Sequence, residues 1–276
     1  MPMINLSNQG LFYEDSGGDK PAVLMMHGFL FDQSMFDPQV KALDSKYRCI
    51  RFDARGFGQT KWDGNPFTLY DTAADALALL DYLGIQKAAV LGMSQGGYAA
   101  LRFALKYPEW VSALVFISTY NGADTEDVKE IYRAMRETWR IRGPEVLLDT
   151  FLNLFIGADA ELRSVWRAKW ALRTAHEIFH TMNNLINRDE IPDDQLAHIR
   201  MPAMVIHGED DQGIPLALGE AFFHSLPNHI KMVRVPGAAH GVNLTHPEQV
   251  NLPLLEFLDQ YVAEAPDPNH KKQRRY

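Results

Sequence analysis

The sequence predicts an α/β protein in which a mostly parallel sheet carries helices on both faces and a helical cap is inserted into the chain. Three observations lead to this prediction. Apolar runs of strand length alternate with amphipathic segments up to about residue 120. Residues 121–190 then read as helix after helix, with no strand pattern. Strand patterns return after residue 191, and alternation of strands with helices is typical of a parallel sheet.

The first part of the chain supplies most of the predicted strands. A first strand is expected over residues 10–15. Continuous apolar runs are typical of strands buried on both faces, and they lie at residues 22–26, 49–52, 88–91 and 113–117. Helices are expected over residues 33–43, 69–83 and 98–106. Thr68 is expected to cap the second of these helices, and Gly84 to end it.

The second part of the chain contains the insertion and the last strands. The helices of the insertion are expected over residues 127–141, 144–155, 160–172 and 175–186. Strands follow at residues 203–207 and 230–235, and helices at 216–223 and 247–261. We therefore expect a core made of residues 1–120 and 191–276, with residues 121–190 forming a helical cap (lid).

Composition limits the possible partners. The net charge of −8 argues against nucleic acid as the main partner. The basic run at residues 271–275 is expected to be a solvated tail. The N-terminus lacks the features of a signal peptide, and no window approaches the ~18 apolar residues of a membrane span. The single cysteine excludes an intrachain disulfide framework. A cytoplasmic protein without a membrane partner is expected.

A G-x-S-x-G motif at residues 92–96 is the strongest chemical signal in the sequence. It follows the apolar run at 88–91 and precedes the predicted helix at 98–106. A strand, a sharp turn and a helix are the context of a nucleophile elbow, which exposes a serine in a strained turn. Ser94 is therefore the candidate nucleophile.

Two later loops supply the expected partners of this serine. A serine hydroxyl needs a base to take its proton, and the base is usually a histidine oriented by a buried carboxylate. In an open α/β sheet these groups lie at the carboxyl ends of strands. His240 follows the strand at 230–235. Asp210 and Asp211 both follow the strand at 203–207, and either of them could be the acid. The three residues occur along the chain in the order Ser, Asp, His, which is the order expected for a catalytic triad on such a sheet.

The chain resembles the α/β-hydrolase superfamily over nearly its whole length. It is most similar to the small bacterial esterases, lactonases and 3-oxoadipate enol-lactonase-like proteins. The resemblance rests on four motifs in order, each after its own strand: His-Gly-Phe at 27–29, Asp-Ala-Arg-Gly-Phe-Gly at 53–58, Gly-Met-Ser-Gln-Gly-Gly at 92–97, and Gly-Ala-Ala-His at 237–240.

The resemblance implies a choice between the two aspartates. In similar proteins the acid lies in a G-x-x-D-x-x-x-P pattern, which residues 208–215 match with Asp211 rather than Asp210. A rarer variant places the acid after the preceding strand, where Asp124 would be the candidate.

The oxyanion hole is expected to consist of two backbone N–H groups. One belongs to Gln95, the residue after the nucleophile. The other, by resemblance to His-Gly-x loops, belongs to Phe29, and His27 is expected to be a structural ring that holds this loop. Trp139 is the candidate substrate-binding residue, because tryptophans near this point of the cap line the pocket in similar enol-lactonases. Other apolar cap positions are Met135, Leu147, Phe151, Phe155, Trp166, Trp170 and Phe179.

The expected function is hydrolysis of a small-molecule ester or lactone through an acyl-enzyme. No paired metal-ligand spacing and no phosphate-binding glycine motif is present, so neither a metal nor a cofactor is expected. Serine at the elbow argues against haloalkane dehalogenases and epoxide hydrolases, which use aspartate. Three alternatives stay open: a slowly turning-over receptor or regulator for a small lactone, a carbon–carbon bond hydrolase, and a perhydrolase. Leu30 departs from the proline that perhydrolases often carry.

Overall fold

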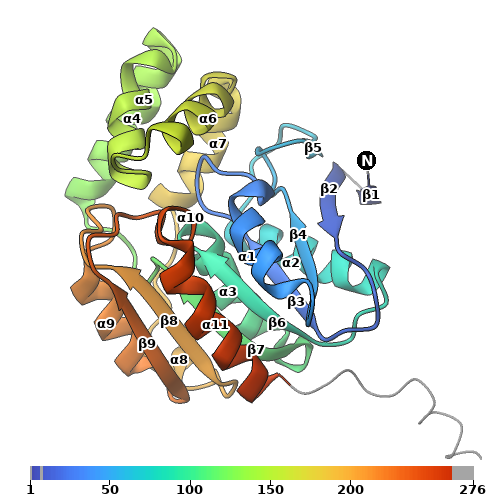
Figure 1. Ribbon diagram of the computed structural model, residues 1–276. Coiled ribbons are helices and arrows are strands. Elements are labelled where there is room, and N and C mark those ends of the chain that lie inside the picture. Colours follow the sequence, from blue (N-terminus) through green and yellow to red (C-terminus); the bar gives the residue numbers. More distant parts are fainter. Residues whose placement is uncertain (1, 7–8, 263–276) are drawn as a thin grey trace, which may run out of the picture.

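The computed structural model describes residues 2–6 and 9–262, which form one sheet with helices on both sides (Figure 1). The basic run at 271–275 lies outside the described residues. The strands are β1 (Met3–Leu6), β2 (Gln9–Asp15), β3 (Ala22–Met26), β4 (Arg48–Phe52), β5 (Lys61–Trp62), β6 (Ala88–Met93), β7 (Val111–Ile117), β8 (Ala203–Gly208) and β9 (His229–Val235).

The sheet is mostly parallel, as predicted. Its strand order is β1-β2-β4-β3-β6-β7-β8-β9, and β5 pairs with β2. The pairs from β4 to β9 are all parallel, whereas β1, β2 and β5 join the sheet through antiparallel pairs. Neither β1 nor β5 was predicted, since both are short and lack a continuous apolar run. The carboxyl ends of the parallel strands meet along one edge, which is where loops gather into a site.

The helices confirm the predicted alternation with small shifts at their ends. They are η1 (Gln33–Phe36), α1 (Asp37–Leu43), α2 (Leu69–Tyr82), α3 (Gln95–Lys106), η2 (Pro108–Trp110), α4 (Glu126–Arg142), α5 (Glu145–Phe155), α6 (Ala160–Ala171), α7 (Ala175–Ile186), α8 (Asp193–Leu196), α9 (Leu216–Ser225), α10 (Val242–Thr245) and α11 (Pro247–Tyr261). Thr68 caps α2 as expected, in a reciprocal capping box with Asp71.

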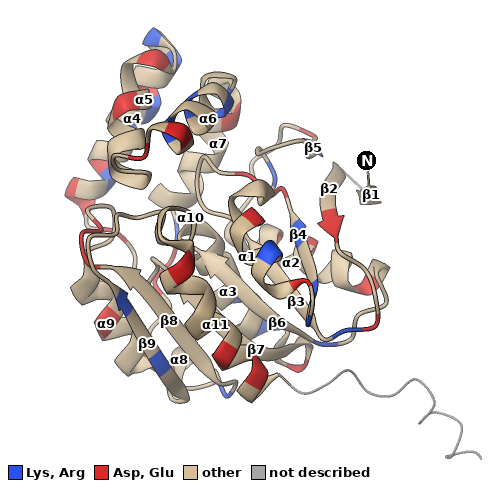
Figure 2. Ribbon diagram, in the orientation of Figure 1, with Lys and Arg blue, Asp and Glu red and all other residues tan. Residues whose placement is uncertain are grey.

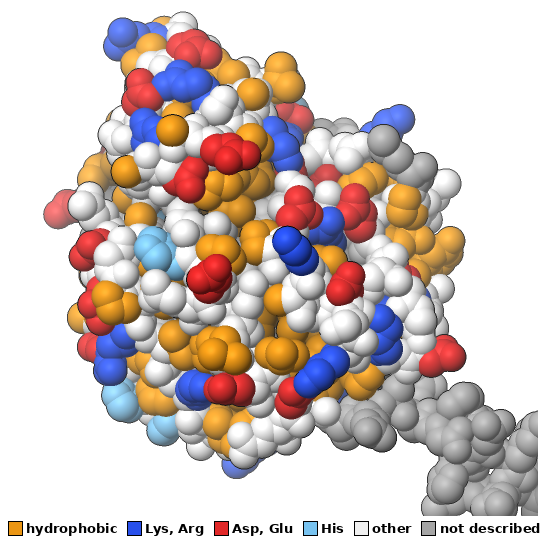
Figure 3. Space-filling view, in the orientation of Figure 1, with side chains coloured by type: hydrophobic (Ala, Val, Ile, Leu, Met, Phe, Trp, Pro, Cys, Tyr) orange, Lys and Arg blue, Asp and Glu red, His pale blue; other side chains and the backbone are white. Residues whose placement is uncertain are grey.

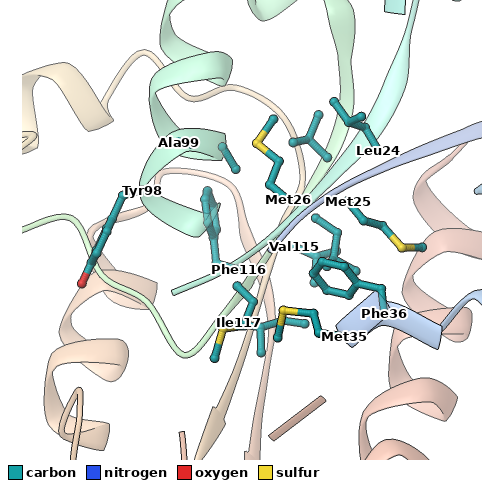
Figure 4. Close-up of a cluster of buried hydrophobic side chains, with 14 of the residues drawn as sticks. Leu24, Met25, Met26, Met35, Phe36, Tyr98, Ala99, Val115, Phe116 and Ile117 are labelled. Carbon is teal, nitrogen blue, oxygen red and sulfur yellow. The ribbon is translucent and has the colours of Figure 1, made fainter. Parts of the chain in front are cut away.

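Alternating side chains of the central strands form two apolar layers, one on each face of the sheet (Figure 4). Met26 in β3 and Phe116 in β7 lie on the side of α3, whereas Met25 lies on the side of Phe36. All four of these side chains are buried. Strands covered on both faces need apolar residues at successive positions, which explains the continuous runs in the sequence.

Helices α4 to α7 lie between β7 and β8 in the sequence and stand beyond the carboxyl edge of the sheet (Figure 1). Positive and negative side chains are interspersed along them (Figure 2), and the face of the molecule in Figure 3 shows the same mixture. The division into a core of 1–120 and 191–276 and a cap of 121–190 stays a prediction. We call α4 to α7 the cap helices.

No helix in the described part of the chain, residues 2–6 and 9–262, is long and apolar enough to cross a membrane.

Candidate active site

Ser94 occupies the turn between β6 and α3 in a strained conformation. Its φ of 50° and ψ of −116° lie in a region that residues with a side chain rarely adopt. The turn is tight because a Cβ on Gly92 would lie 2.4 Å from the carbonyl oxygen of Gly96, and a Cβ on Gly96 would lie 2.0 Å from that of Met26. Both glycines are therefore required by close backbone packing, and the motif predicts the local structure correctly.

His240 lies against this serine. The Oγ of Ser94 is 2.8 Å from Nε2 of His240, and Nδ1 of His240 is 2.8 Å from Oδ2 of Asp211. All three side chains are buried. His240 follows β9 and Asp211 follows β8, so the three groups come from the carboxyl ends of three strands.

Asp211 is held by its own loop as well as by His240. Its Oδ1 accepts hydrogen bonds from the backbone N–H groups of Gly213 (2.8 Å) and Ile214 (2.9 Å). Burial raises the pKa of this carboxyl, but the charges and hydrogen bonds of His240 and His207 outweigh burial and hold the pKa well below its ordinary value. Asp211 is therefore ionised, and the shared hydrogen must reside on Nδ1 of His240.

The two other candidate acids lie elsewhere. Asp210 is exposed, and its backbone N–H bonds to the carbonyl oxygen of Ala238. Asp124 pairs with the guanidinium of Arg188 and accepts a hydrogen bond from the hydroxyl of Tyr120. Of the three candidates, Asp211 is thus the one that contacts His240.

His207 is a part of the site that the sequence analysis missed. It is the second-last residue of β8, is fully buried, and places Nε2 3.3 Å from Oδ2 of Asp211 and 2.8 Å from the carbonyl oxygen of Ile214. Because a carbonyl oxygen only accepts, Nε2 carries a hydrogen and faces the carboxylate. A polar ring at the end of an otherwise apolar strand, four residues before the acid, was the available signal.

The loop after β3 runs directly beside the elbow. A Cβ on Gly28 would lie 3.4 Å from the Cβ of Ser94, so the next residue, Phe29, starts next to the serine. Gln95 is the first residue of α3, and the first N–H groups of a helix have no acceptor within it. The positive end of the same helix faces the serine. The N–H groups of Phe29 and Gln95 stay the predicted donors of an oxyanion hole.

His27 holds this loop, as predicted. Its Nε2 accepts a hydrogen bond from the N–H of Ala54 (3.0 Å), and its Nδ1 donates to the carbonyl oxygen of Gly28 (2.9 Å). Burial lowers the pKa of His27, which keeps the ring neutral in this role.

The cap helices contact the site at three places. Lys169 of α6 pairs with Asp32 in the loop after β3 and donates to Oγ of Ser34 (2.6 Å). Nε2 of Gln95 donates to the carbonyl oxygen of Thr181 in α7 (3.1 Å). Phe155 of α5 packs on the ring of His240, with 5.3 Å between ring centroids.

Trp139 lies inside the cap. Its side chain is 1% exposed, and its Nε1 donates to the carbonyl oxygen of Arg173 (3.2 Å). Its ring neighbours Phe151, which in turn contacts Phe29. Its role in substrate binding stays a prediction. Among the other cap positions, Phe155 is the one in ring contact with His240.

Stability is expected to depend on pH through Asp211. A carboxyl whose pKa is lowered by folding stabilises the protein above the ordinary pKa of about 3.9, and this contribution is lost as the pH falls towards the folded value. We expect wild type to lose about 2 kcal/mol more of its unfolding free energy between pH 6 and pH 2.5 than Asp211→Asn does. Urea unfolding at both pH values measures this difference.

The exposed Asp210 provides the control for this experiment, since Asp210→Asn should keep the pH dependence of wild type. Burial raises the pKa of Asp15 and Asp32, but their ion pairs and hydrogen bonds outweigh burial and lower it. Both carboxyl groups are present in every variant, so they do not affect the comparison. Equal pH dependence in wild type and Asp211→Asn would contradict the expectation.

Within the described residues no group of three or more histidine, cysteine, aspartate or glutamate side chains is arranged to hold a metal ion.

Known proteins that are similar to this chain have the same type of fold. A model of the alpha/beta hydrolase fold family matches residues 21–247 of the chain. The chain is 29% identical, over 90% of its length and 90% of the relative, to a 2-hydroxy-6-oxononadienedioate/2-hydroxy-6-oxononatrienedioate hydrolase of Paraburkholderia phymatum. It is 26% identical, over 90% of its length and 95% of the relative, to the bifunctional esterase/perhydrolase DCH of Acinetobacter calcoaceticus.

Two solved structures are similar over almost the whole chain. A thermophilic esterase from Thermogutta terrifontis superposes with a TM-score of 0.87 at 25% identity, covering 95% of this chain and all of that one. The enol-lactonase of Burkholderia xenovorans LB400 superposes with a TM-score of 0.86 at 22% identity, covering 94% of this chain and all of that one. At this identity the second likeness concerns the fold alone.

Proposed function

The chain belongs to the alpha/beta hydrolase fold family, and from this premise we propose that it hydrolyses a carboxylic ester or lactone of a small molecule through an acyl-enzyme. The observation that carries the proposal is the hydrogen-bonded chain from Ser94 through His240 to Asp211, with both distances at 2.8 Å. The bifunctional esterase/perhydrolase relative and the esterase structure support the same class of reaction.

The proposed mechanism assigns one step to each of these groups. His240 takes the hydroxyl proton through Nε2 while Oγ of Ser94 attacks the carbonyl carbon. The N–H groups of Phe29 and Gln95 bind the oxyanion, and such a donor typically contributes about 3 kcal/mol to transition-state stabilisation. His240 then gives its proton to the leaving alkoxide. Water, activated by the same ring, cleaves the acyl-enzyme, and Asp211 stabilises the imidazolium.

The surroundings favour an uncharged acyl group. The ring of Phe29 contacts Phe151, Phe151 contacts Phe155, and Phe155 packs on His240. Several basic cap residues that could meet an anionic substrate are engaged with acids: Arg140 with Glu137, Arg163 with Asp149, Arg167 with Glu145 and Asp149, and Lys169 with Asp32. The aromatic rings beside His240 and these ion pairs disfavour the dicarboxylate type of substrate named for the Paraburkholderia relative.

A substrate panel tests this proposal. It contains p-nitrophenyl acetate, butyrate and octanoate, an uncharged lactone, a hemisuccinate ester with a free carboxylate, and a vinylogous 1,5-diketone as substrate for carbon–carbon cleavage. We expect kcat near the ~10 s⁻¹ typical of enzymes on an uncharged ester or lactone, and a lower kcat/KM for the charged ester of equal length.

Other outcomes separate the alternatives. Preferred cleavage of the diketone would replace the proposal with carbon–carbon bond hydrolysis. Efficient formation of peracetic acid from acetate and hydrogen peroxide would identify a perhydrolase. Tight binding of a lactone with turnover far below ~10 s⁻¹ on every compound would identify a receptor or regulator.

A further inference from the structure

The last turn of cap helix α5 is bonded to the loop that carries His240. The carbonyl oxygen of Leu154 accepts a hydrogen bond from the N–H of His240 (3.4 Å), and that of Phe155 accepts one from the N–H of Gly241 (2.9 Å). The final carbonyl groups of a helix have no donor within it. The end of α5 and the backbone of the histidine loop therefore satisfy each other.

Gly241 permits this approach. A Cβ at this position would lie 2.5 Å from the carbonyl oxygen of Phe155, which is closer than atoms in a folded protein tolerate. A larger residue would push the end of α5 away from the histidine loop. The close contact thus depends on both segments, although 85 residues separate them.

The side chain of Phe155 adds a second contact. Its ring packs on the imidazole of His240 at 5.3 Å between centroids and 38° between planes. It is buried and supported by Phe31, Phe151 and Trp170, whose rings lie 5.8, 5.7 and 5.9 Å away. The imidazole is therefore fixed by the Phe155 ring as well as by its hydrogen bonds at either nitrogen.

The charge distribution of α5 acts in the same direction. The C-terminal end of a helix carries about half a negative charge. This end is bonded to the backbone of the residue whose side chain becomes positive when it takes the proton of Ser94. The helix end favours the imidazolium, together with the carboxylate of Asp211.

We propose that Phe155 and the last turn of α5 position His240 for proton transfer, so that the cap is part of the catalytic machinery as well as a cover. This inference rests on the proposed function. Phe155 acts through His240, by fixing the plane of the imidazole and keeping water off its face. It is a positioning residue and forms no bond with the reacting atoms.

Kinetics of Phe155→Ala and Phe155→Leu on a p-nitrophenyl ester test the proposal. We expect Phe155→Ala to lower kcat and kcat/KM equally, by roughly 10- to 100-fold, because an interaction needed only for proton transfer affects both. Phe155→Leu keeps most of the apolar volume and so the fold, but loses the flat ring, and we expect an intermediate loss.

Trp166→Leu is the matched control. Trp166 is another buried aromatic residue of the same cluster, and its ring contacts Phe31 and Trp170. Its replacement should lower the melting temperature as Phe155→Leu does and change kcat by less than about threefold.

Gly241→Ala separates the end of α5 from the histidine loop by another route. Its effect on kcat should be less than additive with that of Phe155→Ala.

Three outcomes would overturn the inference: wild-type kcat in Phe155→Ala, a change confined to KM, which would assign Phe155 to the substrate wall, or an equal loss of kcat in Trp166→Leu. An active Ser94→Ala enzyme would instead overturn the proposed function. The two failures are therefore distinguishable.

Discussion

Replacing Ser94 with alanine is expected to lower kcat for p-nitrophenyl ester hydrolysis by about a million-fold, the loss typical of removing a serine nucleophile. The substitution deletes one oxygen atom and leaves the Cβ that the turn already accommodates at φ 50°. The melting temperature should therefore change little. Steady-state kinetics of the purified variant measure the first effect, and thermal unfolding measures the second.

Ser118→Ala provides a control for this experiment. Ser118 is also a buried serine with a positive φ, 46°, at the end of the neighbouring strand β7. Its replacement should leave kcat within about threefold of wild type. Retained activity in Ser94→Ala, or an equal loss in Ser118→Ala, would contradict the assignment of Ser94 as the nucleophile.

Asp211→Asn should have the second largest effect, a loss of about ten-thousand-fold in kcat. An asparagine has almost the same shape, but its amide group does not hold the Nδ1–H tautomer of His240. The imidazole then presents a hydrogen at Nε2, the atom that must accept the serine proton. Kinetics with the same ester provide the measurement.

The adjacent Asp210 is the natural comparison for this variant. Asp210→Asn alters an exposed side chain, and we expect kcat within about threefold of wild type. A larger loss in Asp210→Asn than in Asp211→Asn would exchange the roles of the two residues.

Features of the site that depend on neighbouring residues were predictable from the sequence. The elbow around Ser94 needs glycines two residues away on each side, because the strand and helix meet at atomic contact there. The strands were recognisable because both of their faces are covered. The family pattern singled out Asp211 over Asp210, and the choice is a matter of which of two adjacent side chains turns inwards.

Features that depend on contacts between distant segments could not be predicted from the sequence. Nothing near Phe155 in the sequence distinguishes it from Phe151 or Trp166, and its contact with His240 arises from the way α5 is placed over the sheet. His207 reads as the end of a strand, and its role follows from the loop that returns Asp211 beside it. The short strands β1 and β5 pair with β2 at the antiparallel edge, where the apolar pattern is weakest.

The hydrogen bond between Ser94 and His240 also determines when, during synthesis of the chain, the proposed active site can form. It joins residues 146 positions apart. His240 follows β9, the edge strand that pairs with β8 and is the last strand to be made among those in residues 2–6 and 9–262. A nascent chain can thus fold the elbow, the oxyanion loop and the cap before the base has left the ribosome. Ribosome-bound intermediates are expected to be folded but inert until the loop after β9 brings His240 to Ser94.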